Sequence, residues 1–455
     1  MARAFKFFAP LFVCALGILS VQAQMARKVY VDYKEITLKN GLRVITVEDH
    51  SAPVISLSVT YNVGSRNERK GRTGFAHLFE HMMFKGSENV GSGEHFVLVF
   101  NNGGNMNGTT NEDRTNYFEA LPANQLDLAL FLESDRMRSL AITKDNLDNQ
   151  RNAVQEERRL GVDNQPYGKT GELQQEMLYD NFAYKHSVIG SMEDLNAASV
   201  EDVSEFFKTY YAPNNAVMVL VGDFDTKDAV ARIKKSFESI PRQPDPPSVD
   251  MTEPEQKAER RATIEDVLAR LPRVDIAYKA VPGNTADYYA LAVLGAALQG
   301  GQSSRLYQKL VKEKELTTNV NGFMDEKRGT GALYTFATLR PNVKAVDVEA
   351  AIYEEIERLK KEPIADWELQ KAKNTTRRGF INSLQSSLAR AVTLGQFSVY
   401  YNEPGLINTR LDKVSAVTKD DVQRVANKYL GETNRTIIIT MPKAKAAGAT
   451  TAKVQ

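Results

Sequence analysis

The sequence predicts an α+β protein made of two homologous α/β-sandwich domains. Composition is the first reason, because 455 residues with 42% hydrophobic and 25% charged residues are typical of a globular chain with two or more cores. Internal repetition is the second. The stretch 202–210 recurs at 421–429 with a constant offset of 219, and the same offset brings Asn215 onto Asn434. The chain therefore reads as a duplicated unit of strands and helices.

Residues 1–23 have the pattern of a secretory signal. Arg3 and Lys6 form a basic start, an apolar stretch too short to span a bilayer follows, and a cleavage site is expected near Ala23. No later segment approaches about 18 consecutive apolar residues, so no membrane contact is expected after cleavage. We expect an exported, periplasmic protein; the alternative is that this segment remains as an uncleaved membrane anchor.

Cysteine and charge restrict the chemistry further. The single cysteine, Cys14, lies inside the signal, so the mature chain has neither disulfides nor thiolate metal ligands, and His and carboxylate remain for zinc. The formal net charge is +1, and loss of Arg3 and Lys6 makes it −1. This balance gives no indication of a nucleic-acid or anionic membrane partner.

The first elements read as a hairpin, a central strand and a helix. Residues 27–48 alternate around a turn at Asn40, and residues 52–63 are dense in β-forming side chains. A helix then covers 74–84 and ends near Gly86, a suitable C-cap.

A glycine- and asparagine-rich segment at 103–110 is predicted to be a turn that leads into an edge strand at 114–121. A phosphate-binding loop is excluded because no Gly-Lys-Ser/Thr follows the glycines. An edge strand can accept an extended peptide as an added strand. The plainer alternative is an ordinary glycine turn.

Two helices follow. Residues 125–140 have helical periodicity, and Thr143 is expected to cap a helix that runs to about Gly161. One side of this second helix carries Gln150, Ala153, Val154 and Glu157. The charged cluster at 156–159 could be a solvated face, but Glu157 lies on the apolar side and there requires a partner.

The remaining pattern predicts the domain boundaries. A helix at 200–211 and a strand at 216–221 complete the first unit, and the second has a strand at 274–281 and helices at 285–298 and 346–362. We expect an N-terminal domain at 24–240, a proline-rich linker at 241–260, a C-terminal domain at 261–445 and a frayed tail at 446–455.

The helix at 74–84 contains the residues of a metal-dependent hydrolase. His77 and His81 stand four residues apart and therefore share one helix face, with Glu80 beside them. A metal ion can lower the pKa of a water molecule to about 7, and a nearby carboxylate can take its proton. The order is H-x-x-E-H. A buried core histidine is the alternative reading, but the chain has only five histidines, and two of them occur here at ligand spacing.

Three motifs together resemble the pitrilysin/insulinase family of inverted-motif zinc peptidases. They are the helix at 77–81, the Gly/Asn segment at 103–110 and the stretch 151–157, whose Glu157 lies 76 residues beyond His81. Length and duplication resemble the bacterial branch related to the mitochondrial processing peptidase, and this chain resembles the zinc-bearing subunit.

The resemblance implies roles for individual residues. His77, His81 and Glu157 would bind one zinc ion per chain and Glu80 would be the general base, a ligand set typical of catalytic zinc. The substrate backbone would bind at the edge, which comprises Asn107, Gly108, Thr109 and Thr110. Many relatives have a supporting glutamate where this chain has Gln150, which hydrogen-bonds without charge.

The resemblance also implies a partner. Active relatives often supply an arginine and a tyrosine from the second half, but Val311 and Thr318 occupy those positions here, and the nearby Arg305 and Tyr307 fit a different segment. We expect a homologous subunit to supply the pair in a heterodimer, with a homodimer as the alternative, and the two chains to close like a clamshell. The predicted function is an exported zinc metalloendopeptidase. The alternatives are a non-catalytic scaffold and a peptide-binding subunit.

Overall fold

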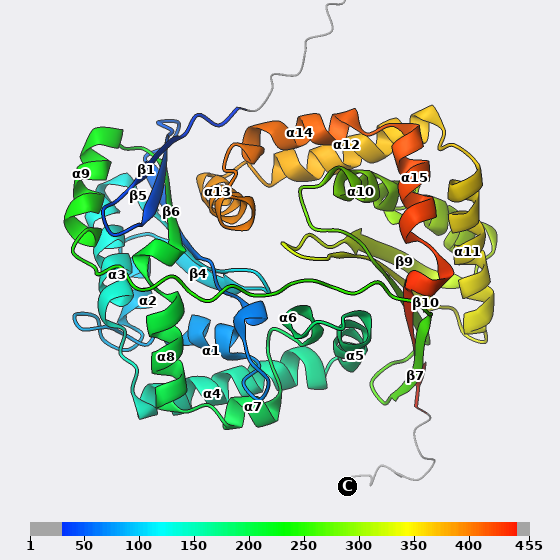
Figure 1. The fold of residues 1–455 in the computed structure, drawn as a ribbon, viewed down its shortest axis with the longest axis horizontal. Helices are drawn as coiled ribbons and strands as arrows, with labels where there is room; N and C mark the ends of the chain where they lie inside the picture. Colours follow the sequence, from blue (N-terminus) through cyan, green and yellow to red (C-terminus); the bar gives the residue numbers. More distant parts are fainter. Residues whose placement is uncertain (1–29, 444–455) are drawn as a thin grey trace, which may run out of the picture. The chain divides into compact units, whose positions relative to one another are not determined.

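The computed structural model describes residues 30–443, which contain two β-sheets covered by helices (Figure 1). The predicted signal at 1–23 and the predicted tail at 446–455 lie outside the described residues. The first sheet has six strands, in the order β1 (Lys34–Thr37), β2 (Arg43–Glu48), β6 (Ala216–Gly222), β3 (Val54–Tyr61), β5 (Thr115–Pro122) and β4 (Asn105–Thr110).

The predicted hairpin and central strand are confirmed. β1 and β2 pair antiparallel from Thr37 and Arg43 onward, and the turn between them contains Gly41 at a φ of 92°, a value that favours glycine. β3 lies between β6 and β5, and seven of its eight residues are buried. Its β-branched and aliphatic side chains suit a strand that is covered on both faces.

The second sheet has five strands in the order β7 (Arg260–Asp266), β11 (Arg435–Pro442), β8 (Arg273–Lys279), β10 (Ala332–Leu339) and β9 (Thr317–Met324). Its helices are α10 (Ala286–Gln299), α11 (Ala345–Lys361), α12 (Asp366–Asn382), α14 (Leu406–Ala416) and α15 (Lys419–Tyr429). The predicted strand at 274–281 and the helices at 285–298 and 346–362 are thus confirmed to within two residues at each end.

Both sheets contain the repeated helix and strand that the sequence predicts. α8 (Val200–Tyr210) precedes β6 as α15 precedes β11, and each helix begins with a capping box. The Nδ2 atom of Asn215 donates to Tyr210 O at 2.8 Å, and Asn434 donates to Tyr429 O at 2.7 Å. Asn215 and Asn434 therefore make equivalent hydrogen bonds to the end of the preceding helix in the two units.

Helices are exchanged between the two halves of the sequence. α13 (Ser387–Tyr401) packs on β3 and β6, where a Cβ at Gly395 would come within 2.4 Å of Thr60 Oγ1. In the reverse direction, α5 (Gly168–Leu178) packs on β11 and β8 of the second sheet. Each sheet thus completes its core with a helix from the other half. The boundaries at 240 and 261 stay a prediction.

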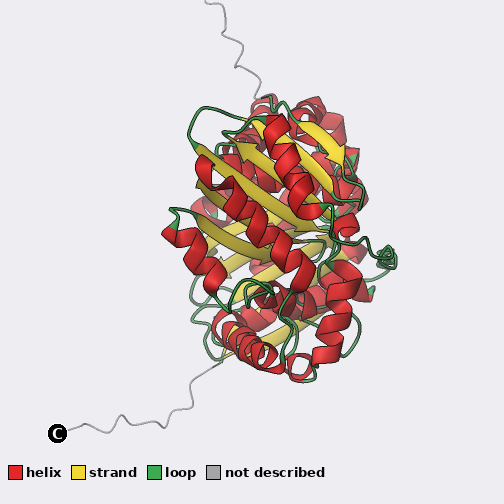
Figure 2. Cartoon of the chain, turned by 90° about the vertical axis from the view of Figure 1, so that its left-hand side faces the viewer, coloured by secondary structure: helices red, strands yellow, loops and turns green. Residues whose placement is uncertain are grey.

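The first sheet is covered mainly by helices of its own half, as Figure 2 shows from the side on which they lie in front of the strands. They are α1 (Phe75–Met82), α2 (Glu94–Asn101), α3 (Leu126–Ser139), α4 (Lys144–Arg158), α7 (Met192–Asn196) and α9 (Thr226–Phe237). The short helix α6 (Phe182–Lys185) differs, because its Tyr184 packs with Ala277 and Ala332 of the second sheet. α1 ends before the predicted Gly86, and α4 continues as one π-helical turn, Arg159–Asp163.

The prediction for the Gly/Asn segment was wrong in one respect. Residues Asn105–Thr110 are themselves the edge strand β4, whereas the predicted edge strand at 114–121 is the interior strand β5, paired on both sides. The turn is displaced to Asn111, whose Oδ1 accepts from the backbone N–H groups of Asp113 and Arg114, both at 2.9 Å. An Asn that holds its own turn permits the preceding polar residues to pair as a strand.

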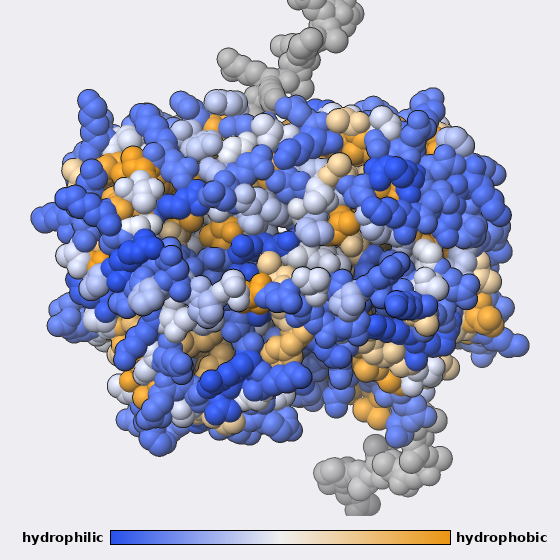
Figure 3. Space-filling view, viewed as in Figure 1, coloured by the Kyte–Doolittle hydropathy of each residue, from blue (hydrophilic) through white to orange (hydrophobic). Residues whose placement is uncertain are grey.

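The connector between the two sheets contains no helix or strand over residues 241–257, and β7 begins at Arg260, so the linker at 241–260 stays a prediction. It is attached to the second sheet by Gln256, whose Nε2 donates to Thr433 O and Arg435 O at 2.9 Å. Among residues 30–443, no helix is long and apolar enough to cross a membrane. The face drawn in Figure 3 is mostly hydrophilic, with apolar residues in small scattered groups.

Candidate metal centre

Helix α1 carries two of the predicted ligands. Leu78, Phe79 and Met82 are buried against the sheet, so His77 and His81 lie on the partly exposed side of the helix. The N-cap residue is Gly74, which has no side chain to cap the helix. The carboxylate of Glu68 does this instead, accepting from Gly74 N at 2.9 Å and Ala76 N at 2.8 Å.

Glu68 is in turn held by a histidine from another segment. Nε2 of His186 lies 2.9 Å from Glu68 Oε2, and His186 Nδ1 lies 2.9 Å from Phe182 O. Burial alone would lower the pKa of His186, but the hydrogen bond to Glu68, the charge of Glu68 and the hydrogen bonds to two backbone carbonyls together outweigh it, and the pKa is raised. Burial raises the pKa of Glu68, and its hydrogen bonds oppose that rise. No local pattern in the sequence indicated this cap.

The third predicted ligand comes from α4. Thr143 caps this helix as predicted, and its Oγ1 accepts from Asn146 N at 3.2 Å. The far end of α4 is held by Arg158, whose Nη1 donates to Gly190 O at 2.8 Å. Gly190 also touches the start of α1, since a Cβ there would come within 2.4 Å of Thr73 O. One segment therefore fixes both ligand-bearing helices.

The three side chains converge. His77 Nε2 lies 3.6 Å from Glu157 Oε1, His81 Nε2 lies 3.3 Å from Glu157 Oε2, and the two imidazole rings are 4.8 Å apart. Zinc bonds of about 2.0–2.1 Å in a tetrahedron place ligand atoms roughly 3.4 Å apart, so the group fits a zinc ion. Glu157 is half exposed, which leaves one side of the group open.

The protonation of the histidines suits a metal ligand. Burial lowers the pKa of His77 to about 4, and the charge of His81 adds to that effect. Burial also lowers the pKa of His81, although Glu157 opposes the shift. Neutral imidazole is the form that binds metal. The Nδ1 atom of His77 is buried without a hydrogen-bond partner among residues 30–443, so its other nitrogen is the atom aimed at the group.

Glu80 lies beside this group with its carboxylate oriented by β4. Thr110 Oγ1 donates to Glu80 Oε2 at 2.6 Å, and a Cβ at Gly108 would come within 2.9 Å of Glu80 Cγ. Burial raises the pKa of Glu80 to about 7, and the charge of Glu157 adds to the rise. A carboxylate with this pKa can act as a general base near neutral pH.

The four residues predicted to bind substrate lie on β4 but face two ways. Gly108 and Thr110 contact Glu80, whereas Asn107 is exposed and Thr109 is held by the guanidinium of Arg114. A pocket of about 270 Å³ adjoins this strand. Its lining includes Glu80, His81, Phe84, Lys85, Phe96, Asn107 and Gln150.

Gln150 is buried and lines the same pocket as His81, which is the place that the resemblance implies for a supporting residue. The residues of the second half that were compared with the Arg/Tyr pair of active relatives make contacts within the fold. Val311 is buried in the core, Thr318 donates to Thr338 O at 3.2 Å, and Arg305 makes two contacts of 2.8 Å to Glu368. Tyr307 begins a π-helical turn, Tyr307–Glu313. None of these four lines the pocket beside β4.

A second group of potential ligands, His95, Glu119 and Glu133, lies in the core of the first half. Arg136 pairs with Glu133 there, so two carboxylates and one guanidinium leave a single negative charge. One proton balances that charge, whereas a divalent ion would leave an excess positive charge in the core. Burial raises the pKa of Glu119 well above its usual range, consistent with that proton. The group of His77, His81 and Glu157 is the better candidate.

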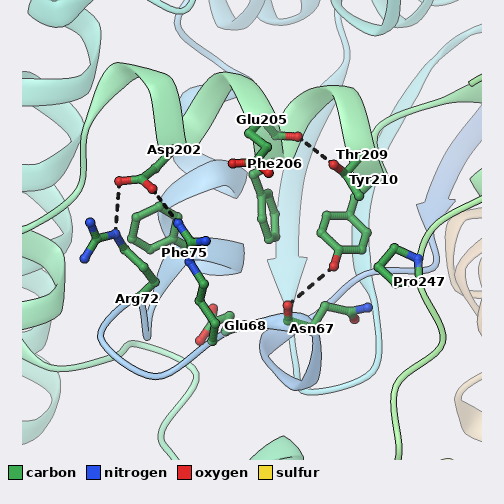
Figure 4. Close-up of a pocket in the computed structure, with 11 residues that line it drawn as sticks. Asn67, Glu68, Arg72, Phe75, Asp202, Glu205, Phe206, Thr209, Tyr210 and Pro247 are labelled. Carbon is green, nitrogen blue, oxygen red and sulfur yellow. Dashed lines mark hydrogen bonds and ion pairs between the residues drawn. The ribbon is translucent and has the colours of Figure 1, made fainter. Parts of the chain in front are cut away.

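Another surface pocket, of about 410 Å³, lies between the loop before α1 and helix α8 (Figure 4). Phe75 and Phe206 line it, and Arg72 at its rim is paired with Asp202 at 3.0 Å. It contains none of the residues of the metal group. The chemistry is therefore concentrated in the smaller pocket beside β4.

The fold and the site together define a class. Two α/β units, an H-x-x-E-H helix and a distant glutamate brought beside the two histidines are the features of a metallohydrolase. The chain belongs to the M16 (insulinase) peptidase family. The family model for insulinase, peptidase family M16, matches residues 43–190, and the model described as the peptidase M16 inactive domain matches residues 197–376.

Relatives agree with this assignment. The zinc protease PqqE of Helicobacter pylori is 32% identical over 93% of this chain and 96% of its own length. A solved protease structure from Helicobacter pylori, also 32% identical, has a TM-score of 0.86 over 91% of this chain and 100% of the other. The periplasmic protease PqqL of Escherichia coli has a TM-score of 0.73 at 18% identity, over 91% of this chain and 48% of that one, and shows the fold alone.

Proposed function

We propose that this chain is an exported zinc metalloendopeptidase that cleaves peptides or unfolded polypeptide segments. The observation that carries the proposal is the convergence of His77, His81 and Glu157 at 3.3–3.6 Å beside a buried Glu80. Membership in a peptidase family and a relative named as a zinc protease support it. His77, His81 and Glu157 would hold one zinc ion per chain, which when bound supplies a Lewis acid and makes water easier to deprotonate.

Three residues beside this group would transfer the proton and orient the group that transfers it. Glu80 takes the proton of the attacking water and returns it to the leaving amine, and its pKa of about 7 suits both transfers. Thr110 keeps the carboxylate oriented through the 2.6 Å hydrogen bond. Gly108 provides the space in which the carboxylate sits, because a side chain there would displace it.

An extended substrate would pair with the free edge of β4. Asn111 N donates to Arg114 O at 3.0 Å and closes the turn, so alternate residues back along β4 exchange hydrogen bonds with β5. The backbone groups of Met106, Gly108 and Thr110 then point off the sheet. Asn107 Oδ1 accepts from Gly108 N at 2.9 Å and would exchange that bond for one to the peptide.

The location and the domain boundaries belong to the same proposal. The signal pattern at 1–23 supports export, and PqqL, which shares the fold, is described as periplasmic. The proline-rich linker, which has no helix or strand over residues 241–257, supports the proposed boundaries at 240 and 261.

A homologous partner chain would complete the enzyme. Active relatives often have an arginine and a tyrosine at the positions that Val311 and Thr318 occupy in this chain. Val311 is buried in the core and Thr318 hydrogen-bonds the backbone, so neither is available to hold a substrate. PqqL is about twice as long as the region that it shares with this chain, which fits an enzyme of two such units. We propose a heterodimer in which this chain provides the zinc site.

The test compares zinc content and peptide hydrolysis in wild type, Glu80→Gln and Glu157→Gln, each with and without the homologous chain. Glu80→Gln should keep zinc and lose turnover, and Glu157→Gln should lose zinc affinity. Turnover that survives in Glu80→Gln would refute the role of the base. Zinc-free wild type that binds peptide without cleaving it would favour a scaffold or peptide-binding subunit. Full activity of the single chain would refute the heterodimer.

A further inference from the structure

Two arginines near the turn after β4 have no carboxylate partner among residues 30–443, although Nη1 of one of them, Arg328, donates to Asn62 Oδ1. Arg114 follows the turn after β4, and Arg328 lies in the loop between β9 and β10. Neither guanidinium is within 4.0 Å of a carboxylate oxygen among residues 30–443, although both side chains are only partly exposed. Burial lowers the pKa of both from the usual arginine value. A partly buried cation without an anion is costly, and a bound anion would remove that cost.

The carboxylates of this region are already paired with other cations. Asp113 meets Arg66 at 3.2 Å, while Glu112 and Asp325 meet Lys327 at 2.7 and 2.8 Å. Three carboxylates therefore share two cations, and Arg114 and Arg328 add two more. The carboxylate of Glu80, whose charge also acts on Arg114, brings the local balance to zero when it is ionised. The guanidinium groups of Arg114 and Arg328 are nevertheless not in contact with any of these carboxylates, and a bound anion could contact them directly.

The two arginines come from opposite halves of the chain but are brought to one place. Arg328 N donates to Asp113 Oδ2 at 2.9 Å, and Asp113 is the residue that precedes Arg114 in the sequence. The Tyr400 hydroxyl of α13 lies at the same turn, because its partner Asn111 accepts from Arg114 N through Oδ1 at 2.9 Å. It also accepts from Asn111 Nδ2 at 2.8 Å, which leaves its own proton free to donate.

Arg114 is fixed against the edge strand with donors to spare. Its Nη1 donates to Thr109 O at 2.8 Å, so the side chain lies on the face of β4 that carries Asn107 and Thr109. Its Nε is buried and has no hydrogen-bond partner within the described part of the chain. Every second side chain of a peptide paired with β4 would lie on this same face.

We propose that Arg114, Arg328 and the Tyr400 hydroxyl form an anion subsite for a carboxylate of the peptide bound along β4. This inference rests on the proposed function, since it requires a peptide at that edge. The carboxylate can come from an Asp or Glu side chain or from a peptide C-terminus, and both make the same charge-assisted hydrogen bonds to guanidinium groups. The subsite would make the enzyme select acidic segments.

The test uses the zinc-loaded mature chain with its homologous partner and a set of matched peptides. The peptides differ only in Asp, Asn or Lys at one position in turn, and each is made with a free and an amidated C-terminus. We expect one position at which Asp exceeds Asn in kcat/KM by roughly tenfold, the effect of one charged hydrogen bond. A gain that amidation abolishes would identify the C-terminal carboxylate as the source.

Four variants decide the assignment. Arg114→Gln and Arg328→Gln should each lose the preference for Asp, and Arg328→Glu should favour Lys at the same position. Arg270→Gln is the matched control, because it removes an exposed guanidinium outside this region, and it should keep the preference. Thermal unfolding of each variant identifies any that fails to fold. Such a variant is replaced by Arg→Lys at the same site, which keeps the positive charge and should retain the preference for Asp over Asn.

Three results would overturn the subsite: no preference in the wild type, a preference that survives both Gln variants, or an equal loss of rate for every peptide. The last would mean that Arg114 acts through Glu80 or β4 itself. If the wild type cleaves no peptide, the proposed function fails separately. Binding of the same labelled peptides to Glu80→Gln then tests the subsite alone, and binding that is equal for Asp and Asn would exclude it.

Discussion

Replacing Gly108 by alanine tests the contact between β4 and the proposed base. A Cβ at this position would lie 2.9 Å from Glu80 Cγ, 3.1 Å from Oε1 and 3.3 Å from Cδ. Gly108 does not have a positive φ, so the backbone accepts alanine without strain. The whole effect of the methyl group therefore falls on the carboxylate of Glu80.

The size of the effect follows from these distances. Ordinary carbon contacts need about 3.5–4.0 Å, so Glu80 must move by roughly 0.5–1 Å. A displacement of this order at a reacting group can lower the rate by about 100-fold. The cost of overpacking, about 1–3 kcal/mol, should appear as a lower unfolding temperature. Zinc content should stay at the wild-type value, because the three ligands are not displaced.

The assay is kcat/KM on one peptide, together with zinc content and thermal unfolding. Gly379→Ala is the matched control, since a Cβ at Gly379 of α12 would meet nothing within 4 Å. This control should keep full activity and gain up to about 1 kcal/mol of helix stability. Wild-type kcat/KM in a folded, zinc-bound Gly108→Ala protein would refute the claim that the position of the Glu80 carboxylate controls the rate.

Three further predictions concern the surroundings of the metal group. Thr110→Val removes the hydrogen bond to Glu80 and should lower kcat by roughly tenfold with zinc retained; an unchanged kcat would contradict its orienting role. Gln150→Glu places a charge beside His81 and should tighten zinc binding, measured by chelator competition; weaker binding would contradict the supporting role. His186 has a raised pKa, so its ion pair with Glu68 stabilises the fold below the unfolded pKa of about 6.5, and this stabilisation is lost as the pH rises through the higher folded value. The difference in unfolding temperature between wild type and His186→Gln should narrow over that rise, and a constant difference would exclude the ion pair.

The parts of this structure that depend on local sequence could be predicted. The H-x-x-E-H helix and the Thr143 cap involve residues within about one turn of each other. The repeat at an offset of 219 could be found because both copies keep the same local helix and capping pattern. Glu157 could be singled out because the side of a helix on which a residue lies follows from its spacing. Its place beside His77 and His81 is a matter of tertiary packing, which only the structure provides.

The parts that depend on distant contacts could not. The sequence predicts a turn where β4 lies because glycine and asparagine disfavour strands, but pairing with β5 and contact with Glu80 outweigh that propensity. The exchange of α5 and α13 between the sheets leaves no local signal, since both are ordinary amphipathic helices. The cap that Glu68 gives to α1 spans six residues of irregular loop, a spacing that matches no capping motif.

The most direct measurement is an anomalous diffraction map of the zinc-loaded protein at the zinc absorption edge. We expect one peak per chain, about 2.0–2.2 Å from His77 Nε2, His81 Nε2 and a carboxylate oxygen of Glu157. A map with no peak at these three residues, or with its peak at His95, Glu119 and Glu133, would contradict this expectation.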